Sequence, residues 1–186
     1  MHRMIVALAA VVALAIPGGS DARADEPLNV VATTSMIADA ARVIGGENVS
    51  VRALMGPGID PHSYRQTRSD IAAATRADLV PRHGLYLEAQ MEAFFEGLSR
   101  RVPVVAVAEV LPKDALFGHA TYENKYDPHV WMDPGLWAEV VVAVRDALGE
   151  AAPDRAAAFA ERADAYLAEI AALDAYAGTV IATIPA

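Results

Sequence analysis

A strand–helix–strand pattern near the start of this 186-residue chain most constrains its fold. Leu28 to Thr33 is an apolar, β-branched run that predicts a buried strand, and Val49 to Leu54 alternates apolar and polar residues as a second strand does. Between them, Ser35 can cap a helix from Met36 to Ile44, and Gly45-Gly46 can end it. Two strands joined by one helix in fewer than 30 residues run parallel, with a right-handed crossover.

The chain beyond this unit continues to alternate between strand and helix patterns. Further strands are expected at 77–80 and 103–107; Pro81 either ends the first of them or lies where its missing N–H does no harm. Further helices are expected at 70–76 (capped by Thr67 or Ser69), 87–98, 133–148 and 154–177. The sequence therefore predicts an α/β fold over residues 25–150, with a parallel sheet of about four strands flanked by helices, and a long helix over residues 151–178.

The long helix has a continuous apolar stripe. Its members recur at intervals of 4, 3, 4, 3 and 4 residues: Phe159, Ala163, Tyr166, Ile170, Leu173 and Ala177. This spacing predicts one helix face packed along the domain, in preference to a coiled-coil seam, because the stripe lasts for few heptads. Thr179 to Ile184 is predicted to be an incoming strand.

The tripeptide Asp-Pro-His occurs twice, as Asp60-Pro61-His62 and as Asp127-Pro128-His129. Proline restricts its own backbone and that of the preceding residue, so each histidine leaves its loop in a defined direction. Each aspartate can accept a hydrogen bond from the far ring nitrogen or from the loop backbone. His62 follows the second predicted strand and His129 the fourth, so both can reach the carboxyl edge of the sheet.

These two histidines are predicted to converge on one divalent metal ion. The chain has no cysteine, so any metal site must use histidine and carboxylate ligands. The alternative is that both are solvated loop histidines without a role, as most single loop histidines are. The formal net charge of −9 argues against a nucleic-acid partner.

The first residues have the pattern of a secretory signal peptide over residues 1–24. Arg3 precedes the 13-residue apolar run from Met4 to Ile16, which is too short to span a bilayer. Pro17-Gly18-Gly19 interrupts it, and Ala22-Arg23-Ala24 fits a cleavage site. We expect a periplasmic protein that is not membrane-spanning after cleavage and that carries no lipid on an N-terminal cysteine.

Several stretches together resemble the periplasmic solute-binding proteins of zinc and manganese ABC transporters, the cluster A-I metal-binding receptors. They are Val31-Ala32-Thr33-Thr34-Ser35-Met36-Ile37, Gly58-Ile59-Asp60-Pro61-His62-Ser63-Tyr64, Ala77-Asp78-Leu79-Val80, Gly84-Leu85-Tyr86-Leu87-Glu88 and Asp127-Pro128-His129-Val130-Trp131-Met132-Asp133-Pro134. The resemblance covers the chain from about Leu28 onwards and is far more specific than either Asp-Pro-His alone.

The resemblance implies two α/β lobes joined by a rigid helix, with the metal in the cleft between them. His62 and His129 match the two histidine ligands of the family's N-terminal lobe, and the helix from Asp154 matches the linker. The family's other ligands, a His or Glu and an Asp, come from the second lobe. We therefore expect the first lobe and the linker here, with residues 179–186 as the start of a second lobe that this sequence does not include.

The implied function is extracytoplasmic capture of Zn²⁺, or alternatively Mn²⁺, by a monomer that delivers it to an ABC permease in the inner membrane. The roles of two further histidines each have two possible interpretations. His83 either supports the metal ligands without binding the metal or is a plain turn histidine, and His119 either collects metal weakly or is a solvated loop histidine. Tyr64 and Trp131 are expected to pack beside the ligands.

Two functions of other classes compete with metal capture. A metal-dependent hydrolase needs a base and an activated water, but the sequence has no His-Glu-x-x-His, no Gly-x-Ser-x-Gly and no cysteine, so we expect no enzyme. A surface adhesion module would bind a macromolecule without metal and would not need either histidine.

Overall fold

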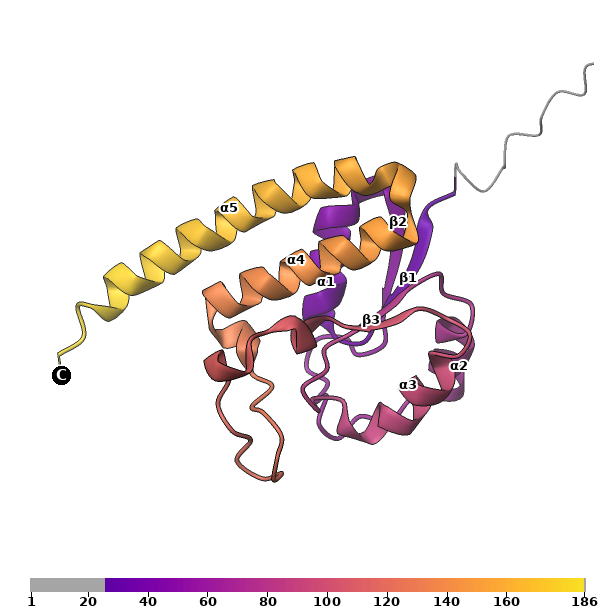
Figure 1. Cartoon of the computed structure of the whole chain (residues 1–186), viewed down its shortest axis with the longest axis horizontal. Coiled ribbons are helices and arrows are strands. Elements are labelled where there is room, and N and C mark those ends of the chain that lie inside the picture. Colours follow the sequence, from indigo (N-terminus) through magenta and orange to yellow (C-terminus); the bar gives the residue numbers. More distant parts are fainter. Residues whose placement is uncertain (1–25, 186) are drawn as a thin grey trace, which may run out of the picture.

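A parallel sheet forms the centre of the computed structural model, which describes residues 26–185 (Figure 1). The strands are β1 (Leu28–Ala32), β2 (Val49–Ala53), β3 (Val80–Arg82) and β4 (Val104–Ala106). β1 pairs with β2, and β3 pairs with β4, both in parallel. The predicted signal peptide lies outside the described residues.

Backbone hydrogen bonds join β1 to β3 and make the strand order β2-β1-β3-β4. Val31 N donates to Leu79 O at 3.0 Å and Thr33 N donates to Pro81 O at 3.2 Å. Proline has no N–H, so one bond of this ladder is missing, yet the strand continues through Pro81 to Arg82. The predicted position of this strand, residues 77–80, was therefore too close to the N-terminus, and Pro81 does not end the strand.

The helices cover the two faces of the sheet in two groups. They are α1 (Ser35–Gly45), α2 (Arg68–Ala74), α3 (Glu92–Leu98), α4 (Pro134–Ala151) and α5 (Ala156–Ile181). Short 3-10 turns lie at 46–48, 89–91, 107–110, 113–115, 130–132 and 153–155. The predicted α/β fold, a parallel sheet flanked by helices and followed by a long helix, is confirmed.

The alternation of side chains along β1 separates two hydrophobic clusters. Val30 and Ala32 belong to the cluster formed with α1, α4 and α5. Val31 points to the other face and belongs to the cluster of α2 and α3, which includes Phe95 and Leu98. Because successive strand residues face opposite sides, one buried strand supports both helix layers.

Two helix starts differ from the prediction. Thr34, not Ser35, caps α1, and its hydroxyl accepts a hydrogen bond from the Ile37 N–H. The helix expected from residue 87 begins only at Glu92, because Glu88 (φ −90°, ψ 48°) and Met91 (φ −109°, ψ 0°) are not α-helical. Just before them, Leu85 and Tyr86 adopt left-handed backbone conformations with φ values of 50° and 65°. The chain therefore turns through this segment before α3 can form.

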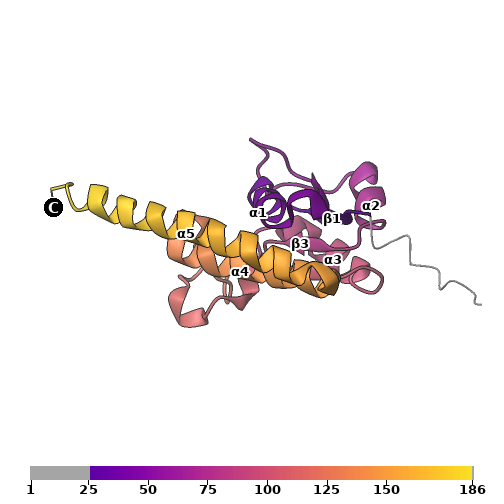
Figure 2. The same cartoon turned by 90° about the horizontal axis from the view of Figure 1, so that it is seen from above.

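α5 lies along α4 and α1, and its C-terminal end projects beyond the rest of the molecule (Figures 1 and 2). The apolar stripe is covered up to Ile170, whereas Leu173 is 56% exposed. The helix continues to Ile181, so the strand expected at residues 179–184 is wrong. A β-branched segment needs a neighbouring strand to form a sheet, whereas here the backbone hydrogen bonds are made within the helix. The Thr179 hydroxyl also donates to Ala175 O.

No helix within residues 26–185 is both long enough and apolar enough to cross a membrane.

The covered and uncovered parts of the stripe should differ in their contribution to stability. Ile170→Ala should lower the free energy of unfolding by about 2–4 kcal/mol, because it leaves a cavity in the core. The neighbouring Leu173→Ala should cost less than about 1 kcal/mol, because this side chain is largely solvated. Urea denaturation of the two variants measures both values, and equal losses would contradict this description of α5.

Candidate metal site

The structure brings the two predicted histidines together. The Nε2 atoms of His62 and His129 lie 3.3 Å apart, and their ring centroids are 5.3 Å apart. His62 is half-buried and His129 is exposed, so a solute can reach the pair from outside. His62 comes from the loop after β2, and His129 from the loop that follows β4 and its 3-10 turn. The convergence predicted for the carboxyl edge of the sheet is therefore observed.

Asp127 fixes the ring of His129. Its Oδ1 atom accepts hydrogen bonds from the His129 backbone N–H at 2.9 Å and from the His129 ring Nδ1 at 2.6 Å. These bonds hold the pKa of the Asp127 carboxyl below its ordinary value. When Nδ1 carries the proton, Nε2 is the unprotonated nitrogen, which is the tautomer that a metal-binding imidazole needs.

Asp60 acts on the loop backbone instead. Its carboxylate accepts from the His62 N–H at 3.0 Å and from the Ser63 hydroxyl at 2.8 Å. The Ser63 hydroxyl and the His62 N–H hold the pKa of this carboxyl below its ordinary value. The two aspartates therefore have different roles: Asp60 shapes its own turn, whereas Asp127 shapes its turn and also sets the orientation of the His129 ring.

His83 lies behind the second Asp-Pro-His and is fully buried. Its Nε2 atom donates to Pro128 O at 2.8 Å, next to His129 in the chain. The ring of Trp131 stands edge-on to the ring of His83, with 5.4 Å between the ring centroids, and its centroid lies 5.1 Å from that of the His129 ring. His83 is therefore a residue that supports the loop from inside, and the alternative of a plain turn histidine is wrong.

Burial lowers the pKa of His83 to about 4. The ring must stay neutral in the folded protein, because a buried imidazolium would have to lose its hydration. The hydrogen bond to Pro128 works against this shift without overcoming it. Consequently, protonation of His83 is coupled to unfolding.

Glu88 joins the carboxyl ends of two strands. Its side chain is fully buried and accepts from the Thr33 hydroxyl at 2.6 Å, the His83 N–H at 2.7 Å and the Gly84 N–H at 3.1 Å. One of these bonds is to the left-handed Gly84, whereas the next N–H, that of Leu85, donates to Glu109 Oε1 at 2.9 Å. No local sequence signal distinguishes Glu88 from a surface residue, so its structural role was missed.

His119 does not join the pair. Its Nδ1 atom accepts from the Thr121 and Tyr122 backbone N–H groups, and its ring packs on Tyr122 at 4.8 Å. A ring bound in this way organises its own loop, which differs from both a solvated histidine and a metal collector. Within residues 26–185, no three His, Asp or Glu side chains gather closely enough to hold a metal ion.

The chemistry available at this edge is that of two nitrogen donors. The two Nε2 atoms lie 3.3 Å apart, and one ring is oriented by a carboxylate. This arrangement suits binding of a cation. Trp131 packs beside His129 as predicted.

Most of the chain matches known proteins. Residues 30–186 match the family model described as ZnuA, zinc-uptake complex component A, periplasmic. Manganese-binding lipoprotein MntA of Bacillus subtilis (strain 168) is 41% identical over 162 residues, which are 87% of this chain and 53% of MntA. Zinc-binding protein TroA of Treponema pallidum (strain Nichols) is 39% identical over 169 residues, which are 91% of this chain and 54% of TroA.

A third relative and a solved structure agree with these matches. Iron-binding protein YfeA of Yersinia pestis is 34% identical over 157 residues, which are 84% of this chain and 50% of YfeA. The structure of periplasmic zinc-binding protein TroA from Treponema pallidum is similar with a TM-score of 0.82 at 38% identity, and the match covers 86% of this chain and 57% of that chain. The chain thus spans about half the length of the curated relatives it matches.

Protonation of His83 should make stability depend on pH between 6.5 and 4. Above pH 6.5 the His83 ring is neutral in both the folded and the unfolded state, so its interactions contribute fully to the free energy of unfolding. Below that value the unfolded chain takes up a proton that the folded protein does not, so the free energy of unfolding falls by about 1.4 kcal/mol per pH unit until about pH 4.

Urea denaturation at pH 7 and pH 5 tests this. The wild type should lose about 2 kcal/mol more than His83→Gln, whose amide can still donate to Pro128 O but does not titrate. An equal loss in the two proteins would show that His83 does not couple folding to protonation.

Proposed function

This chain belongs to the family of periplasmic component A of zinc-uptake complexes (ZnuA), and we propose that it captures a divalent transition-metal ion outside the cytoplasm. Zn²⁺ is the proposed cargo, His62 and His129 are the proposed ligands, and an ABC permease in the inner membrane is the proposed recipient. The approach of the two Nε2 atoms to 3.3 Å carries this proposal.

The separation of the two nitrogens fits a shared ion. Nitrogen ligands bind zinc at about 2.0–2.1 Å in a tetrahedral arrangement, and two such ligands on one ion lie about 3.3–3.4 Å apart. The observed distance of 3.3 Å is within this range. A cation can therefore bind both rings with little movement of the loops, in place of the proton that the two nitrogens otherwise share.

The surroundings of His129 also support ligation. An imidazole that donates its other N–H to a carboxylate has a fixed tautomer and a more basic free nitrogen. Asp127 provides that carboxylate, and its lowered pKa keeps it ionised at neutral pH. Asp127 thus orients His129 toward the cation without binding the cation itself.

The chemistry of the donor atoms favours zinc over manganese. The relatives' names assign manganese to MntA, zinc to TroA and iron to YfeA, so family membership alone does not select one metal. Two imidazole nitrogens favour zinc, whereas manganese prefers more oxygen ligands. Mn²⁺ is the alternative cargo of the same site.

We propose that this chain corresponds to the first lobe and the linker helix of its longer relatives. Residues 25–150 form the proposed metal-binding lobe, and residues 151–178 the proposed linker, with residues 179–186 leading to a second lobe. Residues 1–24 are the proposed signal peptide. Two histidines fill half of a tetrahedral sphere, so water completes it here, and this chain should bind metal more weakly than a two-lobe receptor.

A binding protein is favoured over the other two classes. The matched family is described as an uptake component, which is not an enzyme class, and this disfavours a metal-dependent hydrolase. An adhesion module would have no use for two imidazoles held within bonding distance of one ion. Zinc-dependent ester or phosphate turnover that disappears in His129→Ala would nevertheless favour the hydrolase.

Removing either proposed ligand should abolish most zinc binding. His62→Ala and His129→Ala should each lower the affinity for Zn²⁺ roughly 100-fold, because one remaining imidazole holds the ion weakly. Titration calorimetry measures this, and His119→Ala is the matched control that should bind like wild type. Two single variants with wild-type affinity would mean that the site is misassigned.

Zinc affinity should also depend on pH. Protons compete with the metal for imidazole nitrogen, so binding should weaken below about pH 6. Asp127 does not contribute to this window, because its pKa is already lowered from 3.8. Calorimetric titrations from pH 5 to pH 8 check the trend, and a constant affinity across that range would contradict histidine ligation.

A further inference from the structure

We propose that Tyr64 and Asp70 form a clamp that positions His62 for metal binding. This inference rests on the proposed function, because positioning matters only if His62 is a ligand. Within residues 26–185, neither side chain hydrogen-bonds to either imidazole. The clamp acts on the loop that carries His62, which comprises residues 54–67 and connects β2 to α2.

The loop has few bonds of its own. Apart from the contact between His62 and His129, the hydrogen bonds of residues 56–63 are local: Ile59 N donates to Gly56 O at 3.3 Å, and Asp60 binds its two neighbours His62 and Ser63. Such contacts shape the turn, but they do not fix it relative to the sheet. The position of His62 in the molecule must therefore be set where the loop is tied to the sheet and to α2.

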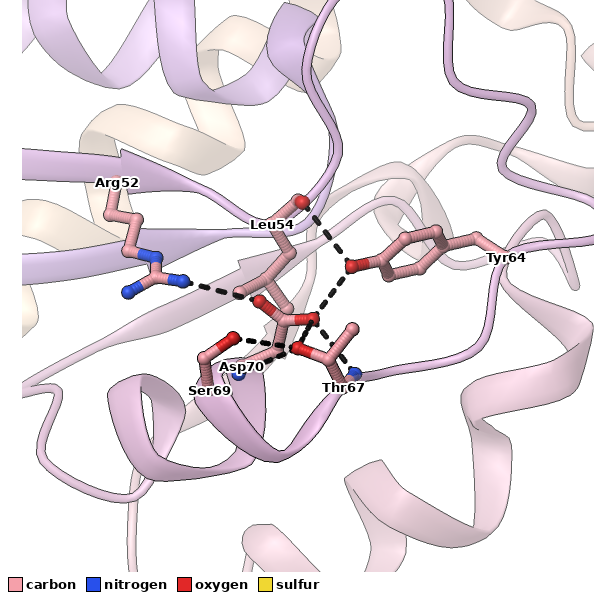
Figure 3. Close-up of polar contacts among 6 residues, drawn as sticks. All are labelled: Arg52, Leu54, Tyr64, Thr67, Ser69 and Asp70. Atoms are coloured by element: carbon pink, nitrogen blue, oxygen red, sulfur yellow. Dashed lines mark hydrogen bonds and ion pairs between the residues drawn. The ribbon is translucent and has the colours of Figure 1, made fainter.

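Tyr64 supplies that tie two residues after His62 (Figure 3). Its hydroxyl donates to Asp70 Oδ2 at 2.6 Å and lies 3.4 Å from Leu54 O at the end of β2. Its ring packs against the hydrophobic cluster of α2 and α3. The side chain thus ties the loop to its base, and two residues span at most about 7 Å, so the Cα of His62 stays within that distance of the Cα of Tyr64.

Asp70 is the fixed end of the clamp (Figure 3). It is buried, and its Oδ2 atom also accepts from the Thr67 N–H at 2.8 Å, while the Asp70 N–H donates to the Thr67 hydroxyl. This reciprocal pair is a capping box at the start of α2. Arg52 on β2 donates to Oδ1 at 3.2 Å, so the carboxylate is tied to both β2 and α2.

The carboxylate remains charged in this position. Burial raises the pKa of Asp70, but the hydrogen bonds from Tyr64 and Thr67 and the charge of Arg52 outweigh it, and the net shift is downward. An ionised acceptor makes short, strong hydrogen bonds, which fits the 2.6 Å contact with the Tyr64 hydroxyl. One buried charge thus holds the sheet, the helix and the loop in one geometry.

Tyr64→Phe is the sharpest test, because it removes the hydroxyl and keeps the packed ring. The affinity for Zn²⁺ should fall about tenfold, as for other groups that orient a metal ligand. In the metal-free protein, amide hydrogen exchange of residues 56–66 should accelerate about tenfold. Tyr176→Phe, on the exposed side of α5, is the control that should change neither measurement.

A double-mutant cycle separates positioning from general stability. In the His129→Ala background, Tyr64→Phe should still lower the weak zinc affinity, because His62 remains. In the His62→Ala background it should have no effect, because the residue that it positions is gone. Asp70→Asn is a second variant and should reproduce the faster exchange of the loop.

The outcomes distinguish this inference from the proposed function. A Tyr64→Phe protein with unchanged affinity and unchanged exchange overturns the clamp, even when His62→Ala abolishes binding. A lower melting temperature with the affinity retained also overturns it, because the network is then only structural. If His62→Ala binds zinc like wild type, the proposed function fails, while loop exchange in the metal-free protein still decides whether the clamp holds the loop.

Discussion

Parallel pairing of the four strands is the constraint on which the site depends. In a parallel sheet all carboxyl ends lie at one edge, so the loops after β2 and β4 leave the sheet on the same side. His62 and His129 are 67 positions apart in the chain, yet their Nε2 atoms approach to 3.3 Å. An antiparallel arrangement would have placed the two Asp-Pro-His loops at opposite ends of the molecule.

Buried polar groups behind the loops convert this general placement into a specific geometry. Asp70 anchors the loop of His62 through Tyr64, and His83 anchors the loop of His129 through Pro128 O. Glu88 joins the strand ends between them. A buried polar group is costly when it lacks partners, so each of these side chains is stable only in the arrangement that satisfies it. Packing alone, which tolerates small shifts of a loop, does not impose that condition.

The sequence predicted what depends on periodicity and missed what depends on long-range contacts. The alternating strand and helix patterns indicated the parallel sheet, and the repeated tripeptide indicated the two histidines. Burial of His83 was not predictable, because it arises from contact with Trp131 and with a loop 45 residues away. Thr67 and Asp70 have the spacing of a capping box, a local signal that could have identified Asp70. The strand expected after residue 178 failed because β preference depends on a neighbouring sheet.

The proposed site brings its two imidazoles together without a metal, which suits capture followed by release. The two imidazoles are close enough to share one ion before any metal arrives, so little free energy is spent on moving the loops when it binds. Two imidazole ligands would leave the remaining coordination positions of a bound ion accessible to other donors, which limits the affinity expected of the proposed site. In the proposed assignment of this chain to one lobe, further donors come from the second lobe, and withdrawal of those donors would leave the ion on the two proposed histidine ligands.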